Sequence, residues 1–167
     1  MSIDRAEWHQ GDDLPADLDP AAAGTHIGMF LAWAVLRDLT SAAHETAHAD
    51  ALAAVRARAA QTTPGRYLAA QCGGSLADDD LAEEAQQFAR EYYISADAAT
   101  GRDGQDDENN NGDDDVVVVG SGVYLDDYER TLAAGLPSLY HVHDSWDNYD
   151  LLAPVLDAAF EAWRERG

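Results

Sequence analysis

The sequence contains no lysine, one cysteine and few basic residues of any kind. All ten basic residues are arginine, and against 32 acidic residues they leave a formal net charge of −22 on a chain of 167 residues. Since phosphate groups are bound by positively charged surfaces, this balance argues against direct binding of nucleic acid or of anionic membranes. Cys72 has no second cysteine to pair with, so an internal disulfide bond and a cysteine-rich zinc site are both excluded.

Targeting segments and common catalytic motifs are also missing. The Met1 end has no basic, apolar leader of a secretory signal, and no run of about 18 apolar residues is present. We therefore predict a cytoplasmic protein without a membrane span. The motifs G-x-S-x-G, H-E-x-x-H and the phosphate-binding loop do not occur, which leaves no sequence signature of a common enzyme class.

The acidity has three interpretations: adaptation to molar salt, mimicry of nucleic acid to block a basic groove, or ordinary acidic composition. The stretch from Asp97 to Asp115 carries a net charge of −7, so −15 remains on the rest of the chain. A mimic needs one acidic face, whereas solvent adaptation needs acidity throughout. The chain-wide distribution and the absence of lysine favour adaptation to high salt.

Apolar residues make up 46% of the chain, enough for one globular domain spanning residues 1–167. Residues 21–39 are apolar on nearly every side, which predicts a central buried helix in a mainly α-helical fold. Further helices are predicted over residues 43–60, over 64–72, from a cap at Asp78 or Asp79 to Tyr92, over 124–134, and from a cap at Asp144 or Ser145 to about Arg166, with a bend at Pro154.

One or two short strands complete the predicted fold. Val116–Val119 is a β-branched run, and Leu139–His143 alternates apolar and polar positions, as extended segments do. Residues 95–122, which include the first of these, form an insertion rich in Asp, Asn and Gly that we predict to be mobile.

Two sets of residues could bind a metal ion. If Leu139–His143 is extended, His141 and His143 share a face, and Asp144 or His26 could complete a ligand set. Alternatively, these side chains satisfy backbone groups at a helix start. The second set is the calcium-loop-like pattern Asp107, Asn109, Asn111 and Asp115, although Val118 stands where such a loop closes with Glu. No other cofactor is predicted.

Three further polar side chains are expected to be structural or solvated. His44 and His48 lie one helical turn apart on a polar face, where they are expected to be solvated. Cys72 lies at a helix end, where it is expected to be packed and unreactive.

Amphipathic aromatic residues suit recognition as well as a core. A binding surface is predicted from Trp8, Tyr92, Tyr140, Trp146, Asn148 and Tyr149.

Several segments together resemble a family of small prokaryotic proteins that carry a domain of unknown function. They are Trp8-His9, THIGMFLAW at 25–33, FAREYY at 88–93, YLDDY at 124–128 and LPSLYHVHDSWDNY at 136–149. In that family the FAxxYY and YLxDY segments lie closer together, so the resemblance implies that residues 95–122 are an insertion. A site within an insertion cannot be shared by the family, which weakens the calcium interpretation.

The sequence thus favours a non-enzymatic binding or inhibitory protein of the immunity type, with a protein partner. A metal-dependent enzyme that uses His26, His141, His143 and Asp144 is the alternative, and nucleic-acid mimicry is a second alternative.

Overall fold

The computed structural model describes residues 1–12, 14–94 and 123–167 of the chain. The fold is mainly helical, as predicted, with one two-stranded sheet. Its elements are β1 (Ser2–Arg5), η1 (Ala6–His9), η2 (Pro20–Gly24), α1 (Thr25–Leu36), α2 (Ala42–Ala47), α3 (Ala49–Arg56), α4 (Pro64–Cys72), β2 (Ser75–Ala77), η3 (Asp78–Asp80), α5 (Glu83–Tyr92), α7 (Val123–Tyr128), η4 (Glu129–Ala133), η5 (Leu139–His141) and α8 (Trp146–Arg166).

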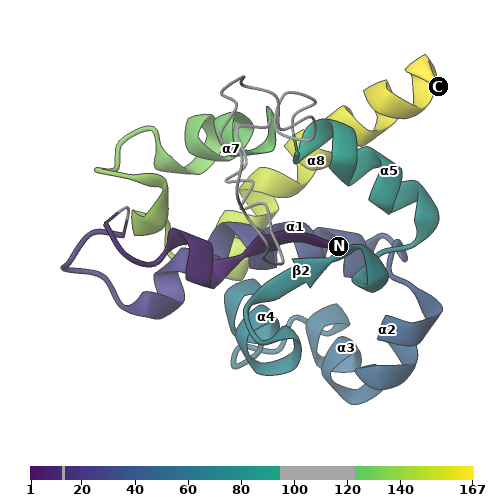
Figure 1. The fold of residues 1–167 in the computed structure, drawn as a ribbon, viewed down its shortest axis with the longest axis horizontal. Coiled ribbons are helices and arrows are strands. Elements are labelled where there is room, and N and C mark those ends of the chain that lie inside the picture. Colours follow the sequence, from purple (N-terminus) through teal and green to yellow (C-terminus); the bar gives the residue numbers. More distant parts are fainter. Residues whose placement is uncertain (13, 95–122) are drawn as a thin grey trace, which may run out of the picture.

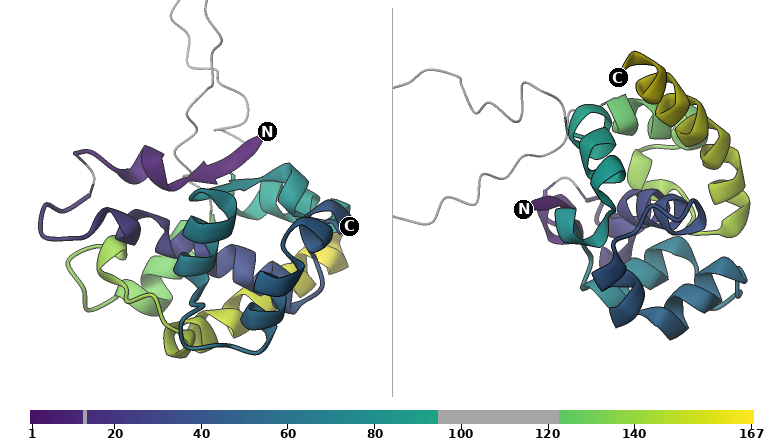
Figure 2. Two further views of the ribbon diagram at one scale, coloured as in Figure 1. Left: turned by 90° about the horizontal axis from the view of Figure 1, so that it is seen from below. Right: turned by 90° about the vertical axis from the view of Figure 1, so that its right-hand side faces the viewer.

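Helix α1 is the centre of the molecule, which confirms the prediction of a buried helix. Every residue from Thr25 to Val35 is buried, because helices pack on several sides of α1. Helices α2, α3 and α4 lie on one side of it, and α5, α7 and α8 lie on the other (Figures 1 and 2). The aromatic rings of Phe30 and Trp33 contact Phe88 and Phe160 on this second side.

Glycine lets α1 and α4 approach closely. A Cβ atom added to Gly28 would lie 2.5 Å from the carbonyl oxygen of Pro64 and 2.8 Å from the Cα of Gly65. Both of these are backbone atoms, which cannot move aside as a side-chain end can. The close packing of these two helices therefore requires glycine at position 28.

Several predicted boundaries were wrong for local reasons. Residues 20–24 form a 3-10 turn before α1, with the Asp19 side chain accepting a hydrogen bond from the Ala21 amide at 2.8 Å. The predicted helix over 43–60 is two short helices, α2 and α3. Asp78 and Asp79 belong to the 3-10 turn η3, so Ala82 rather than an aspartate precedes α5. Helix α4 ends at Cys72 before a left-handed Gly73, as predicted.

The strands lie where none was predicted. β1 pairs antiparallel with β2, and its register shifts between Ser2 and Asp4. Leu139–His143 is not extended, because Leu139–His141 form a 3-10 turn that begins at a Ser138 cap. Val116–Val119 lie outside the described residues, as does the rest of the predicted insertion at 95–122. None of the helices in the described ranges has the length and apolar character that spanning a membrane requires.

Candidate functional site

A buried carboxylate, Asp4, binds polar groups from several parts of the chain. It is 1% exposed, and its Oδ1 lies 2.7 Å from His9 Nε2 while its Oδ2 lies 3.2 Å from His26 Nε2. The Tyr93 hydroxyl donates to Oδ2 at 2.6 Å, and the Arg5 amide donates to Oδ1 at 2.7 Å. We call Asp4, His9, His26 and Tyr93 the Asp4 cluster.

Local structure explains why an aspartate at a strand position points inward. Ile3 and Asp4 are consecutive, yet both are buried, whereas neighbours in a regular strand point to opposite faces. The register shift between Ser2 and Asp4 breaks that alternation, as β-bulges do. His9 then comes from the end of η1, His26 from the first turn of α1 and Tyr93 from the end of α5.

The electrostatics of the cluster favour a charged Asp4 and a neutral His26. Burial alone would raise the pKa of Asp4, but hydrogen bonds from His26 and His9 outweigh it and hold the pKa far below its usual range. Burial lowers the pKa of His26 despite the opposing effect of Asp4. Burial and the Asp4 charge raise the pKa of Tyr93 well above 10.0, so the phenol keeps its proton.

These protonation states assign the hydrogen-bond directions. A charged Asp4 only accepts, so Nε2 of both histidines carries the proton. His26 Nδ1 is then a lone pair, and it is buried with no hydrogen-bond partner among the residues that the structure describes. Nδ1 of His9 lies 2.9 Å from the Tyr140 hydroxyl, within hydrogen-bond distance. The cluster thereby links β1 to η5 as well as to α1 and α5.

The cluster also holds α7 against α1. The Tyr124 hydroxyl donates to the backbone oxygen of His26 at 2.5 Å, and the Tyr128 ring lies edge-on to the His26 ring with centroids 6.0 Å apart. Tyr140 of η5 contacts the same ring at 6.2 Å. Residues of β1, η1, α1, α5, α7 and η5 therefore meet around one histidine.

Chemically, the cluster could hold a divalent metal ion. Ligand atoms of Asp4, His9 and His26 all lie within 4.8 Å of one another. Two imidazole nitrogens with one carboxylate suit Zn²⁺ or Fe²⁺. A bound ion would replace the two imidazole protons that now bridge to Asp4.

The structure does not bring together the metal set predicted from the sequence. His141 hydrogen-bonds Ser138 at 2.8 Å and Asp17 at 3.3 Å, and His143 is exposed. Asp144 accepts from the Thr63 hydroxyl and, at 2.9 Å, from the Gly65 amide, so it satisfies the start of α4. Among the described residues, the only sets of three converging ligands are the Asp4 set and one around His44. The calcium pattern Asp107, Asn109, Asn111 and Asp115 lies outside them.

The predicted aromatic binding surface is largely internal. Tyr92 and Tyr149 belong to the core, at 8% and 0% exposure. Trp8 and Trp146 are half-buried under Arg5 and Arg58, respectively, and Asn148 donates to the backbone oxygen of His143 at 2.9 Å. These side chains therefore pack against other elements or cap them. Of the six predicted surface residues, only Tyr140 contacts the Asp4 cluster.

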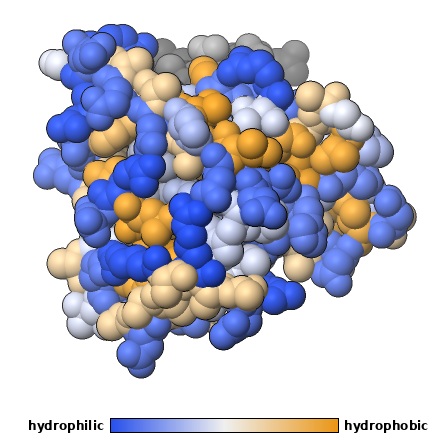
Figure 3. All heavy atoms as spheres, turned by 180° about the vertical axis from the view of Figure 1, so that it is seen from behind, coloured by the Kyte–Doolittle hydropathy of each residue, from blue (hydrophilic) through white to orange (hydrophobic). Residues whose placement is uncertain are grey.

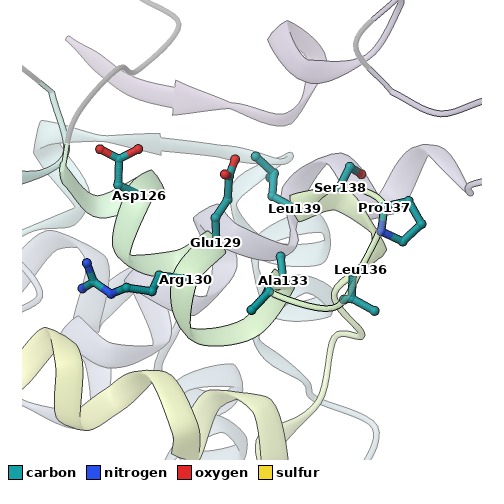
Figure 4. Close-up of a pocket in the computed structure, with 9 residues that line it drawn as sticks. Asp126, Glu129, Arg130, Ala133, Leu136, Pro137, Ser138 and Leu139 are labelled. Atoms are coloured by element: carbon teal, nitrogen blue, oxygen red, sulfur yellow. The ribbon is translucent and has the colours of Figure 1, made fainter.

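A surface groove of about 580 Å³ lies along η4 and the segment 134–139 (Figure 4). Its apolar lining comes from Ala133, Ala134, Leu136, Pro137 and Leu139, and Leu136 is 42% exposed. Asp126 and Glu129 project to one side of it, and Arg130 leaves the helix in another direction (Figure 4). η4 is a π-helix, a rare form that occurs frequently at functional sites.

The fold and the cluster define a small, mainly helical domain held together by a buried Asp–His–Tyr network. The chain belongs to the family described as Domain of unknown function (DUF7832), whose model matches residues 2–142. The matched range includes the Asp4 cluster and the groove but stops before α8. No curated protein and no solved structure matches the chain.

Proposed function

We propose that this protein is a non-enzymatic binding or inhibitory protein, of the immunity type, whose groove along η4 takes a basic segment of a protein partner. The observation that carries the proposal is the groove itself: an exposed apolar lining around Leu136 beside the carboxylates of Asp126 and Glu129. An amphipathic segment with Lys or Arg next to apolar side chains would complement both features.

The charge of the groove supports this choice of partner. Arg130 is neutralised by Asp127, which also accepts from the Tyr92 hydroxyl at 2.7 Å. In the described part of the chain no ion pair joins Asp126 or Glu129 to an arginine. Within the described residues, the groove therefore has two carboxylates without an arginine partner next to its apolar lining.

The Asp4 cluster gives the groove a defined shape. It ties α7 to α1 through Tyr124 and ties η5 to η1 through Tyr140, so both segments that flank the groove are anchored before a partner arrives. A preformed site loses less conformational entropy on binding than a flexible one.

The proposal is tested by site-specific photo-crosslinking in native lysate at molar KCl. A photoreactive residue at Leu136 should capture one protein with a basic surface, and the double variant Asp126→Arg, Glu129→Arg should abolish that product. Leu151, 60% exposed on α8, is the matched control position and should give no such product. No product at Leu136, or the same product at Leu151, would overturn the proposal. A partner that is itself a nucleic-acid-binding protein would favour mimicry.

A second candidate function is metal-dependent chemistry at Asp4, His9 and His26. The convergence of these ligands within 4.8 Å favours it over the set predicted from sequence. Elemental analysis of the protein purified without chelators should then give a stoichiometric metal that His9→Ala removes. A metal-free protein that also fails to bind added Zn²⁺ at this site would eliminate the candidate.

A further inference from the structure

A second group of metal-ligand side chains lies where α2 and α4 end. His44 lies in α2, His48 directly follows that helix, and Cys72 is the last residue of α4. Ligand atoms of these three residues lie within 4.8 Å of one another, and the two imidazole rings have centroids 4.6 Å apart. The expectation that His44 is solvated was wrong, since it is 3% exposed.

His44 is held in an orientation suited to a ligand. Its Nδ1 lies 2.9 Å from Asp80 Oδ1, and the other oxygen of Asp80 accepts from the Ala77 amide at 2.8 Å. A carboxylate that accepts from both groups assigns the His44 proton to Nδ1. A carboxylate behind an imidazole is the usual support of a metal-binding histidine.

The other nitrogens are then available as lone pairs. His44 Nε2 accepts from the Tyr67 hydroxyl at 2.7 Å, a bond that an incoming ion can replace. His48 Nδ1 lies 3.3 Å from the amide oxygen of Gln71, so it carries the proton and leaves Nε2 as the acceptor. Tyr67 and Gln71, which contact His44 and His48, also line a surface groove of about 530 Å³.

Cys72 supplies the sulfur ligand of the group. A thiolate is a soft donor that suits Zn²⁺ and similar ions better than Mg²⁺ or Ca²⁺. A thiophilic ion would displace the thiol proton and bind the thiolate. We propose that His44, His48 and Cys72 form a site for a thiophilic transition-metal ion of the Zn²⁺ class, with one coordination position left open beside Tyr67.

The test uses the reduced full-length protein and Co²⁺ as a spectroscopic substitute for Zn²⁺. We expect one equivalent of Co²⁺ to give a sulfur-to-cobalt charge-transfer band that Zn²⁺ abolishes. Cys72→Ser should lose the band, His48→Ala should weaken Co²⁺ binding, and Asp80→Asn should weaken it about 10- to 100-fold. The exposed His143→Ala variant is the matched control and should bind as the wild type does.

The Asp4 cluster contains no sulfur, so the charge-transfer band reports only the Cys72 site and is independent of both proposed functions. Circular dichroism identifies any variant that fails to fold. The wild-type titration is decisive even then, because absence of the band would overturn the proposal. A band that persists in folded Cys72→Ser would overturn it as well.

Discussion

His26 shows at the scale of a single residue how burial and charge compete. Its imidazole is 1% exposed and faces a charged Asp4, yet burial wins and lowers its pKa. Sequence could place this histidine at the start of a buried helix, and it did suggest a site there. Its partner Asp4 lies 22 residues away in a strand that has no strand-like pattern, so the pairing had no local signal.

The lowered pKa of His26 predicts how stability depends on pH. The unfolded chain binds this proton below about pH 6.5, while the folded chain resists it, so acidification through that range favours unfolding. A single such group changes the free energy of unfolding by up to about 1.4 kcal/mol per pH unit. Between about pH 7 and pH 5, the wild type should therefore lose stability relative to His26→Gln.

Urea unfolding at several pH values measures this difference. His143→Gln is the control, because it makes the same substitution at an exposed position outside the Asp4 cluster. Parallel profiles for wild type and His26→Gln would contradict the assignment of a depressed pKa. Below about pH 4 the depressed pKa of Asp4 adds a second loss of the same sign.

At the scale of elements, the helices owe their positions to contacts that propensity does not report. The run 43–60 reads as one alanine-rich helix, but the chain breaks it at His48, and His44 turns inward to Asp80 and Tyr67. In the same way, the alternation of Leu139–His143 suggested an extended segment. The structure has a 3-10 turn there, which the Ser138 cap and the hydrogen bond between Tyr140 and His9 stabilise. In both segments, hydrogen bonds to distant residues determine the structure more strongly than the local sequence pattern does.

The contact between α1 and α4 predicts an unusual response to a helix substitution. Replacing glycine by alanine inside a helix normally stabilises it by about 1 kcal/mol. In Gly28→Ala the new methyl group would overlap the backbone of Pro64 and Gly65, so we expect a loss of about 1–3 kcal/mol or more. Gly135→Ala is the control, since nothing lies within 4 Å of its Cβ position. Chemical denaturation should show loss only in the first variant.

In helix α8, by contrast, a substitution is expected to stabilise the protein. It continues through Pro154, whose ring removes one hydrogen bond from the helix interior. Because Pro154 is exposed, Pro154→Ala should raise the free energy of unfolding, by up to about 3 kcal/mol. Thermal unfolding of the two proteins checks this. A lower melting temperature in the variant would mean that Pro154 contributes to packing.

At the scale of the whole molecule, the formal net charge is −22, and hydrophilic residues cover much of the face in Figure 3. Seven arginines form ion pairs with acidic side chains in the described part of the chain, from Arg5 to Arg164. The sequence has 32 acidic residues for ten arginines, so acidic groups outnumber basic ones by about three to one. The folded state therefore concentrates negative charge that the unfolded chain would spread out.

This charge predicts a steep dependence of stability on salt. Screening shortens from about 10 Å at 0.1 M to about 3 Å at 1 M, so repulsion within the folded state should fade as KCl is added. We expect the melting temperature to climb through the molar range. Sucrose at matched osmolality is the control and should have a smaller effect. A melting temperature that stays flat in KCl would argue against adaptation to high salt.

The sequence by itself determined the fold class, the central helix and the family, because these follow from composition and from short local patterns. It left Asp144 and Ser145 as alternative caps of α8, and the structure shows that Ser145 is the cap. Only the tertiary structure decided the sites. Asp4 meets His26 and Tyr93 across 22 and 89 positions, and His44 meets Asp80 across 36. Such convergence depends on a bulge in β1 and on the close contact at Gly28 between α1 and α4. Both are contacts between residues far apart in the chain, so no periodic pattern in the sequence indicates them.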